Sequence, residues 1–260
     1  MDSDPELMPA INELVCLLKD LPRALSSQTE IEIRLGYINE INNKYRFDPD
    51  ISEDKFNKIF KALTKYPDWQ DVVQENVKDY YGSDNKRLTR YDDDSSKRTC
   101  VKKTKIQDID FEYISMDMRL SVSQEIICDP DEDWDDIVKE EDITLTRYKK
   151  RTSFYITENW RFDLTIVETE QDGLKSKSYE VELELIDYWD ALVKNNYNMG
   201  WVAHKFFREI KQLMKFCEDE DVIDNMITVK NRKLRNQFSY PILEPGNIEV
   251  FPDSQHDIQE

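Results

Sequence analysis

The sequence predicts a mainly β (α+β) fold, in which about eight antiparallel strands close into a barrel and helices pack on its outside. Between residues 70 and 186, polar and apolar residues alternate with a period of two, which is typical of strands with one buried face. Two segments before this region and one after it repeat apolar residues at helical spacing. Such amphipathic helices need an apolar surface to cover, and the apolar faces of the strands supply one.

Two of the strand candidates carry rows of carboxylates. In Tyr179 to Leu185, the side chains of Glu180, Glu182 and Glu184 share one face and aliphatic side chains share the other. The segment Glu30-Ile31-Glu32-Ile33-Arg34-Leu35 repeats this alternation. A solvated outer face is the ordinary explanation for one such strand. A second copy makes that explanation less favourable, because like charges repel unless a cation lies among them. Together the two strands predict a divalent-cation site.

The remaining elements follow from the same two periods. Helices are expected over Pro5 to Leu21, from Ser52 to about Pro67, over Gly200 to Glu218 and, as a shorter continuation, over Asp221 to Leu234. Strands are expected over Thr29 to Ile38, Trp69 to Asp79, Arg87 to Tyr91, Thr99 to Ile106, Met116 to Ile127, Leu145 to Ile156, Trp160 to Val167 and Ser178 to Ile186. Asn42 to Asp50 is expected to be a loop, and the acidic stretch Asp129 to Asp142 a surface excursion.

Composition excludes several classes of protein. The chain of 260 residues has a formal net charge of −19, so non-specific binding to nucleic acid is not expected, although a basic interior pocket is compatible with this charge. The four cysteines show neither a zinc-binding spacing nor an evident disulfide framework. No apolar run approaches the ~18 residues of a membrane span, and the first residues lack the positive start of a signal peptide. We therefore expect a protein without a membrane partner that works inside the cell, in the nucleus or the cytoplasm.

One domain is expected over residues 1–236. Residues 237–260 contain three prolines and few residues suited to a core. They predict a tail or a linker, which leads to a further domain if this chain is the N-terminal part of a longer protein.

The polar faces of the strand candidates carry many charges. For any one strand, an open sheet with a wet face is the simpler interpretation. If helices cover the apolar faces, however, the charged faces point inward, where charges are costly unless they are paired, hydrated or ligated. Such an interior fits a hydrated passage for a polyanion and a metal ion, because carboxylates bind Mg²⁺ or Mn²⁺ and arginines bind phosphate oxygens.

The ordered set of charged motifs resembles the triphosphate tunnel metalloenzymes, and among them the metal-dependent RNA 5′-triphosphatases of fungal and viral mRNA capping. Glu30-Ile31-Glu32-Ile33-Arg34 is similar to the first glutamate motif of that family, and Glu180-Val181-Glu182-Leu183-Glu184 is similar to the last. Between them, Arg147-x-Lys149-x-Arg151 and Arg161-x-Asp163-x-Thr165 follow in the family's order, after the strand from Arg119 to Glu125. Arginine at position 34 favours the RNA branch, because short-chain members that use other triphosphates usually carry lysine there.

The resemblance implies a hydrolase that removes the γ-phosphate from 5′-triphosphate-ended RNA, the first step of mRNA cap formation. It implies that Glu30, Glu32 and Glu184 bind Mg²⁺ or Mn²⁺, and that Glu182 or Glu125 orients the attacking water. Phosphate contacts are expected from Arg34, Arg87, Arg119, Arg147, Lys149, Arg151 and Arg161. The expected catalytic set is Glu30, Glu32, Glu125, Arg147, Lys149, Arg151, Arg161, Asp163, Glu180, Glu182 and Glu184. Arg90 is the alternative to Arg87, and Lys102, Lys103 and Lys105 are assigned to neither the inside nor the outside of the barrel.

Two other functions stay open at this point. A nucleoside, thiamine or inorganic tri- or polyphosphatase, or a polyphosphate polymerase, would share the fold. A non-catalytic scaffold of a capping complex would need the arginines but not so many metal ligands. A nucleoside triphosphate is expected as a secondary substrate and a guanylyltransferase, in cis or in trans, as a partner, since no K-x-D-G nucleophile motif for GMP transfer occurs in the chain. A viral factory is a further location that the resemblance implies.

Overall fold

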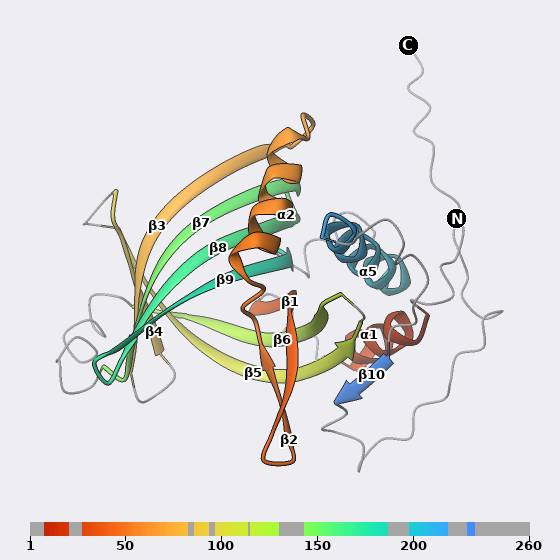
Figure 1. The fold of residues 1–260 in the computed structure, drawn as a ribbon, viewed down its shortest axis with the longest axis horizontal. Helices are drawn as coiled ribbons and strands as arrows, with labels where there is room; N and C mark the ends of the chain where they lie inside the picture. The colour runs from red at the N-terminus through yellow and green to blue at the C-terminus, as the bar shows by residue number, and fades with distance from the viewer. Residues whose placement is uncertain are drawn as a thin grey trace.

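The computed structural model describes residues 8–20, 28–82, 86–93, 97–113, 115–129, 143–186, 198–217 and 228–231. Its helices are α1 (Met8–Asp20), α2 (Glu53–Lys65) and α5 (Met199–Lys215). Its strands are β1 (Thr29–Ile41), β2 (Lys44–Asp48), β3 (Asp71–Tyr81), β4 (Lys86–Tyr91), β5 (Arg98–Glu112), β6 (Asp117–Cys128), β7 (Leu145–Thr157), β8 (Trp160–Gln171), β9 (Leu174–Leu185) and β10 (Thr228–Asn231). Figure 1 shows their arrangement.

Eight of these strands close into an antiparallel barrel. The strands β5, β4, β3, β7, β8, β9 and β1 are neighbours in this order, and β6 completes the ring because it pairs with both β1 and β5. The remaining two strands are additions, with β2 pairing with the end of β1 and β10 with the end of β5. The predicted fold class is therefore confirmed.

Two of the secondary-structure expectations are wrong. Asn42 to Asp50 is not a loop, because it contains β2, which pairs with β1 around a turn at Asn42 and Asn43 whose φ angles are 53° and 58°. In the segment expected to be a short helix, Thr228–Asn231 is a strand, because the end of β5 offers it a backbone partner. The expected tail, residues 237–260, and most of the expected acidic excursion, residues 130–142, lie outside the described residues.

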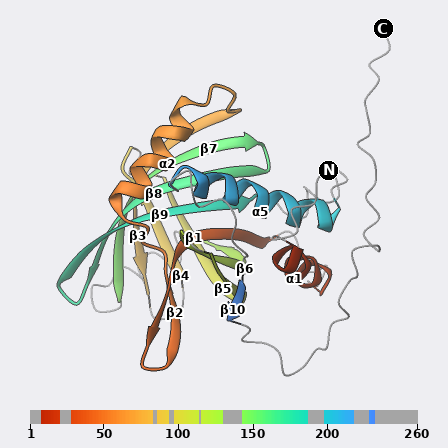
Figure 2. The same cartoon turned by 45° about the vertical axis from the view of Figure 1, so that its right-hand side comes forward.

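The hydrophobic core lies between the outer face of the barrel and the helices. Ile31 and Ile33 on β1 are fully buried there, as is Trp160 on β8. The ring of Trp160 lies 4.7 Å from the ring of Phe206 on α5. Helix α2 packs against β9 and α1 packs against α5, so all three helices lie outside the barrel (Figures 1 and 2). None of the helices that the structure describes is long and apolar enough to cross a membrane.

Candidate active site in the barrel lumen

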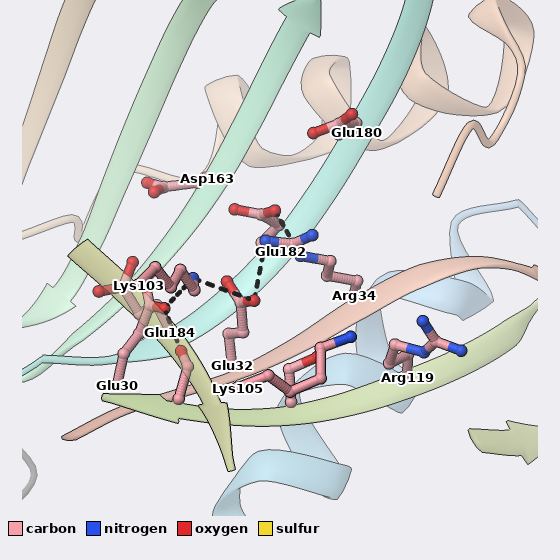
Figure 3. A network of polar contacts seen from close by, with 12 residues as sticks. Glu30, Glu32, Arg34, Lys103, Lys105, Arg119, Asp163, Glu180, Glu182 and Glu184 are labelled. Atoms are coloured by element: carbon pink, nitrogen blue, oxygen red, sulfur yellow. Dashed lines mark hydrogen bonds and ion pairs between the residues drawn. The ribbon is translucent and has the colours of Figure 1, made fainter. Parts of the chain in front are cut away.

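The pairing register brings the two carboxylate rows together inside the barrel. Strands β1 and β9 pair so that Glu32 lies opposite Glu184 and Arg34 lies opposite Glu182. Because the aliphatic neighbours of these residues face the helices, the charged side chains face the lumen. Figure 3 shows them converging there, and Glu32 and Glu182 are only 3% and 7% exposed. The lumen therefore holds several charges that are shielded from bulk water.

Lys103 lies among these carboxylates. Its Nζ donates to Glu30 and lies 3.7 Å from Glu32 Oε1 (Figure 3). The same Nζ lies 3.6 Å from Glu125 Oε1. Strands β5 and β6 pair with Lys103 opposite Glu125, which turns both side chains inward. Burial disfavours the ionised form of Glu30, but the charge of Lys103 and the hydrogen bonds from Lys103 and Ser123 together lower the pKa of Glu30.

Arg34 connects carboxylates from two strands. Its Nη2 lies 2.8 Å from Glu32 Oε1, and its Nε lies 2.8 Å from Glu182 Oε1. Burial opposes the ionisation of Glu182, yet the nearby charges of Arg34 and Arg151 prevail and lower the pKa of Glu182 to about 2. Glu182 is therefore ionised at neutral pH.

Glu32 and Glu184 have the opposite shift. Burial, aided by the charges of Glu182 and Glu30, raises the pKa of Glu32 to about 7 in spite of Arg34. Burial and neighbouring carboxylates, with Glu30 first among them, raise the pKa of Glu184 to about 8, although Arg161 Nη2 lies 2.6 Å from Glu184 Oε2. Additional positive charge near these two carboxylates would favour their ionised forms.

A second charged group lies on β7 and β8. Asp163 is fully buried, and its Oδ2 lies 3.1 Å from Arg161 Nε and 3.6 Å from Arg151 Nη1. Its other oxygen accepts a hydrogen bond from Ser153 Oγ at 2.6 Å. Thr165 is also buried in this wall, and its Oγ1 has no hydrogen-bond partner among the described residues. Asp163 thus holds two guanidinium groups in the lumen.

Two further basic side chains from β7 have acidic partners. Arg147 donates to Glu180. Lys149 Nζ lies 2.6 Å from Asp79 Oδ2, while Asp79 Oδ1 accepts from Thr89 Oγ1 at 2.7 Å. Lys149 is 6% exposed, and Asp79 is its ion-pair partner within the barrel wall.

The structure distinguishes Arg87 from Arg90. Arg87 reaches the lumen, where its Nη2 lies 3.4 Å from Glu125 Oε1, whereas Arg90 is exposed. Arg119 also lines the lumen, but Asp110 accepts from its Nε at 2.6 Å and from its Nη2 at 2.9 Å. Arg87 and Arg119 thus both line the lumen but differ in their contacts. Arg87 lies 3.4 Å from one carboxylate oxygen, whereas Arg119 forms a forked ion pair with Asp110.

Asp79, Asp108 and Asp110 lie outside the set of residues that the sequence predicts. Asp79 lies on the lumen face of β3, at a position that the period of two in the sequence could have identified. The two aspartates of β5 carry no such signal, because a bulge between Lys105 and Gln107 moves the lumen face from odd to even positions. Only the register with β6 reveals them.

The acidic side chains suit a hard divalent cation. Glu30, Glu32 and Glu184 offer oxygen atoms, which Mg²⁺ and Mn²⁺ prefer as ligands. In the described part of the chain, no three acidic, histidine or cysteine side chains are gathered in a metal-binding arrangement, and lysine or arginine contacts each of these glutamates instead. Two of the three carboxylates nevertheless have raised pKa values, which a bound cation would relieve, so the residues fit such an ion.

A closed barrel whose lumen is filled with paired carboxylates, arginines and lysines is a triphosphate tunnel metalloenzyme. The chain belongs to the mRNA triphosphatase family described as "mRNA capping enzyme, beta chain", which residues 70–228 match. It is a polynucleotide 5′-triphosphatase of the metal-dependent type, which carries out the first step of cap formation. The matched range begins after Glu30 and Glu32, so the structure alone brings β1 to the matched strands.

Solved structures support the fold. The Pct1 RNA triphosphatase of S. pombe has a TM-score of 0.63 and 18% identity, covering 82% of this chain and 94% of that one. Pct1 in complex with the Spt5 CTD has a TM-score of 0.61 and 17% identity, with 82% and 93% covered. The Mimivirus capping enzyme triphosphatase has a TM-score of 0.51 and 17% identity, with 83% and 99% covered. No curated protein sequence matches this chain.

Proposed function

We propose that this chain hydrolyses the γ-phosphate of 5′-triphosphate-ended RNA, using Mg²⁺ or Mn²⁺ held by Glu30, Glu32 and Glu184. The observation that carries this proposal is the β1–β9 register, which sets Glu32 opposite Glu184 inside a closed barrel. Most of the chain separates these two strands, so their meeting has no local cause. A cation on these carboxylates would neutralise charge that develops on the γ-phosphate.

Basic residues from several strands bind the triphosphate in this proposal. They are Arg34, Arg87, Arg119, Arg147, Lys149, Arg151 and Arg161. Each already has an acidic partner on the lumen wall, which keeps it inside the barrel until phosphate oxygens compete for it. Arginine offers forked donors that match phosphate oxygens, whereas Lys149 acts as a point charge.

The acidic residues that do not hold the metal ion have two roles. Glu182 orients the attacking water, a role supported by its low pKa, because an ionised carboxylate accepts hydrogen bonds from water. Glu125 and Glu180 hold Lys103, Arg87 and Arg147 in place, and Asp163 does the same for the arginines of its own wall. The chemistry then needs positioning and charge neutralisation rather than a covalent intermediate.

The same site would accept a nucleoside triphosphate as a secondary substrate, because the lumen residues recognise phosphates and carboxylates hold the cation. A capping role further implies a guanylyltransferase, in cis or in trans, to use the diphosphate end, and an intracellular location in the nucleus or the cytoplasm. The alternative function is a nucleoside or inorganic tri- or polyphosphatase of the same fold.

The proposal is tested by phosphate release from γ-labelled triphosphate-ended RNA and from ATP, with Mg²⁺, Mn²⁺ or EDTA. We expect RNA turnover to stop in EDTA and to return with either ion. Glu30→Ala, Glu32→Ala and Glu184→Ala should each lower turnover by about 100-fold or more, since each removes an expected metal ligand.

Glu168→Ala is the matched control, because Glu168 is an exposed glutamate of β8. It should keep wild-type turnover. Thermal unfolding of all four variants shows whether a loss of turnover reflects a loss of fold. Full RNA turnover in excess EDTA would contradict the metal mechanism. Turnover of ATP or inorganic triphosphate by an enzyme that leaves triphosphate-ended RNA uncleaved would favour the alternative function.

A further inference from the structure

The hairpin formed by β2 and the end of β1 stands away from the barrel in both views (Figures 1 and 2). At Gly36, β1 stops pairing with β6, and from Tyr37 onward it pairs with β2. Strands β1 and β2 approach so closely here that a Cβ on Gly36 would lie 2.1 Å from the Asp48 carbonyl oxygen. Ile38 N donates to Asp117 Oδ2 at 2.6 Å, which anchors the base of the hairpin to β6. The hairpin is thus held at a defined angle.

One face of the hairpin continues the lumen face of the barrel. Even-numbered residues of β1 face the lumen, and in the hairpin the even-numbered Ile38 pairs with Phe47. The Phe47 ring lies 4.8 Å from the guanidinium of Arg119, which lines the lumen beside Asp110. Tyr45 lies farther out on this same face and is 43% exposed. A face with Phe47 and Tyr45 on β2, opposite Ile38 and Glu40 on β1, therefore leads outward from the charged interior.

Strand β2 alternates basic and aromatic side chains. Its sequence is Lys44-Tyr45-Arg46-Phe47-Asp48, and Lys44, Tyr45 and Arg46 are all exposed. Since β2 ends the order of paired strands among the described residues, side chains from both of its faces can be reached along one edge. In a chain with a net charge of −19, this edge places two cations beside two aromatic rings. That combination suits single-stranded nucleic acid, whose bases stack on aromatic rings and whose phosphates bind cations.

We propose that this hairpin binds the nucleotides that follow the 5′-triphosphate of the RNA, with Tyr45 as a stacking surface and Lys44 and Arg46 as phosphate contacts. This inference rests on the proposed function and adds a determinant of RNA over free nucleotide. A barrel of about eight strands has room for side chains or one small ligand, so the body of an RNA must remain outside. A free nucleoside triphosphate has no following nucleotides and makes no use of the hairpin.

The test compares Tyr45→Ala and Lys44→Ala/Arg46→Ala with wild type on three substrates: a triphosphate-ended RNA of about 15 nucleotides, ATP and inorganic triphosphate. Stacking on one aromatic ring predicts that Tyr45→Ala raises KM for RNA about five- to tenfold with kcat unchanged. The double variant should raise KM for RNA and lower the slope of log RNA affinity against log salt by about 1.4, because each phosphate contact to a single strand contributes about 0.7. Turnover of ATP and inorganic triphosphate should stay at the wild-type level for both.

Matched controls are available on the outer surface of the barrel. Tyr148→Ala removes a tyrosine that is 41% exposed, and Lys175→Ala/Lys177→Ala removes two exposed lysines of the β8–β9 hairpin. Both should leave the KM for RNA unchanged. Unchanged RNA kinetics in the β2 variants, or equal losses on all three substrates, would overturn the inference. Wild-type enzyme that cleaves ATP but not RNA would instead overturn the proposed function, so the two failures are distinguishable.

Discussion

Glu32 and Glu184 lie opposite each other on β1 and β9, and burial, together with the charges of neighbouring carboxylates, makes both harder to ionise. Their pKa values of about 7 and about 8 lie above that of an ordinary glutamate. A carboxyl group with a raised pKa in the folded state stabilises the fold fully below its unfolded pKa, and this contribution disappears as the pH rises through the folded pKa. The metal-free protein should therefore lose stability from these two residues between about pH 5 and pH 8. Glu182 has the opposite sign: its lowered pKa of about 2 stabilises the fold fully above its unfolded pKa, and this contribution is lost only as the pH falls towards about 2.

A divalent cation competes with these protons, which leads to a prediction about pH. The rise in Tm that Mn²⁺ or Mg²⁺ produces, relative to EDTA, should be larger at pH 8 than at pH 6. Each proton that the cation must displace weakens cation binding by up to about tenfold for every unit by which the pH falls. Thermal unfolding at the two pH values measures this difference. Glu184→Gln cannot titrate and should reduce both the rise in Tm and its pH dependence. An equal rise at both pH values would show that these carboxylates do not hold the ion.

Among the elements, α5 supports the barrel wall from outside through aromatic contacts. Phe206 is fully buried, and its ring lies 4.7 Å from Trp160, which begins β8 beside the lumen residue Arg161. Phe207 similarly contacts Phe111 of β5, with 5.2 Å between the ring centroids. The helix therefore connects two separate strands of the barrel.

Removal of the Phe206 ring should destabilise the protein by about 3–5 kcal/mol, because it takes away buried apolar contacts and leaves a cavity. Phe216→Ala is the control, since Phe216 follows the same helix and is 39% exposed, and we expect a change within about 0.5 kcal/mol. Urea denaturation of both variants measures the difference. Similar midpoints for the two would mean that α5 is not needed to hold the barrel closed.

For the molecule as a whole, a net charge of −19 contrasts with a lumen in which arginines and lysines are paired with carboxylates. The net charge of −19 would repel a polyanion at long range, so we expect a short polyanion such as inorganic triphosphate to bind at the cations inside the barrel. A ligand that binds only the folded state raises its stability by about 2.7 kcal/mol at one hundred times its Kd. For a chain of this size, that corresponds to a rise in Tm of about 5 °C or more.

We therefore expect inorganic triphosphate to raise Tm by at least about 5 °C at saturation, measured in EDTA to prevent hydrolysis. Arg87→Ala should reduce this rise, because Arg87 faces the lumen beside Glu125. Arg90→Ala, on the exposed face of the same strand, should retain it. If the two variants respond alike, the polyanion binds outside the lumen.

Much of the fold and of the site follows from the sequence, because the direction of a side chain on a strand is a local property. The alternation in Glu30 to Leu35 and in Tyr179 to Leu185 predicts one apolar and one acidic face, and the structure has both. The amphipathic helices show that the apolar faces must be covered, which leaves the charged faces inside. The closed barrel and the three helices that pack on its outside are confirmed, the expected short helix after them is wrong, and the catalytic roles of the lumen residues stay predictions.

The tertiary structure decides the features that depend on a remote partner. Thr228–Asn231 and β2 are strands because β5 and β1 pair with them, and a strand, unlike a helix, makes no backbone hydrogen bonds within itself. Lys103 lies inside because its register with β6 sets it opposite Glu125, and a bulge then reverses the inward positions further along β5. Local periodicity carries no information about pairing partners, registers and bulges, because these are set by backbone hydrogen bonds between segments far apart in the chain.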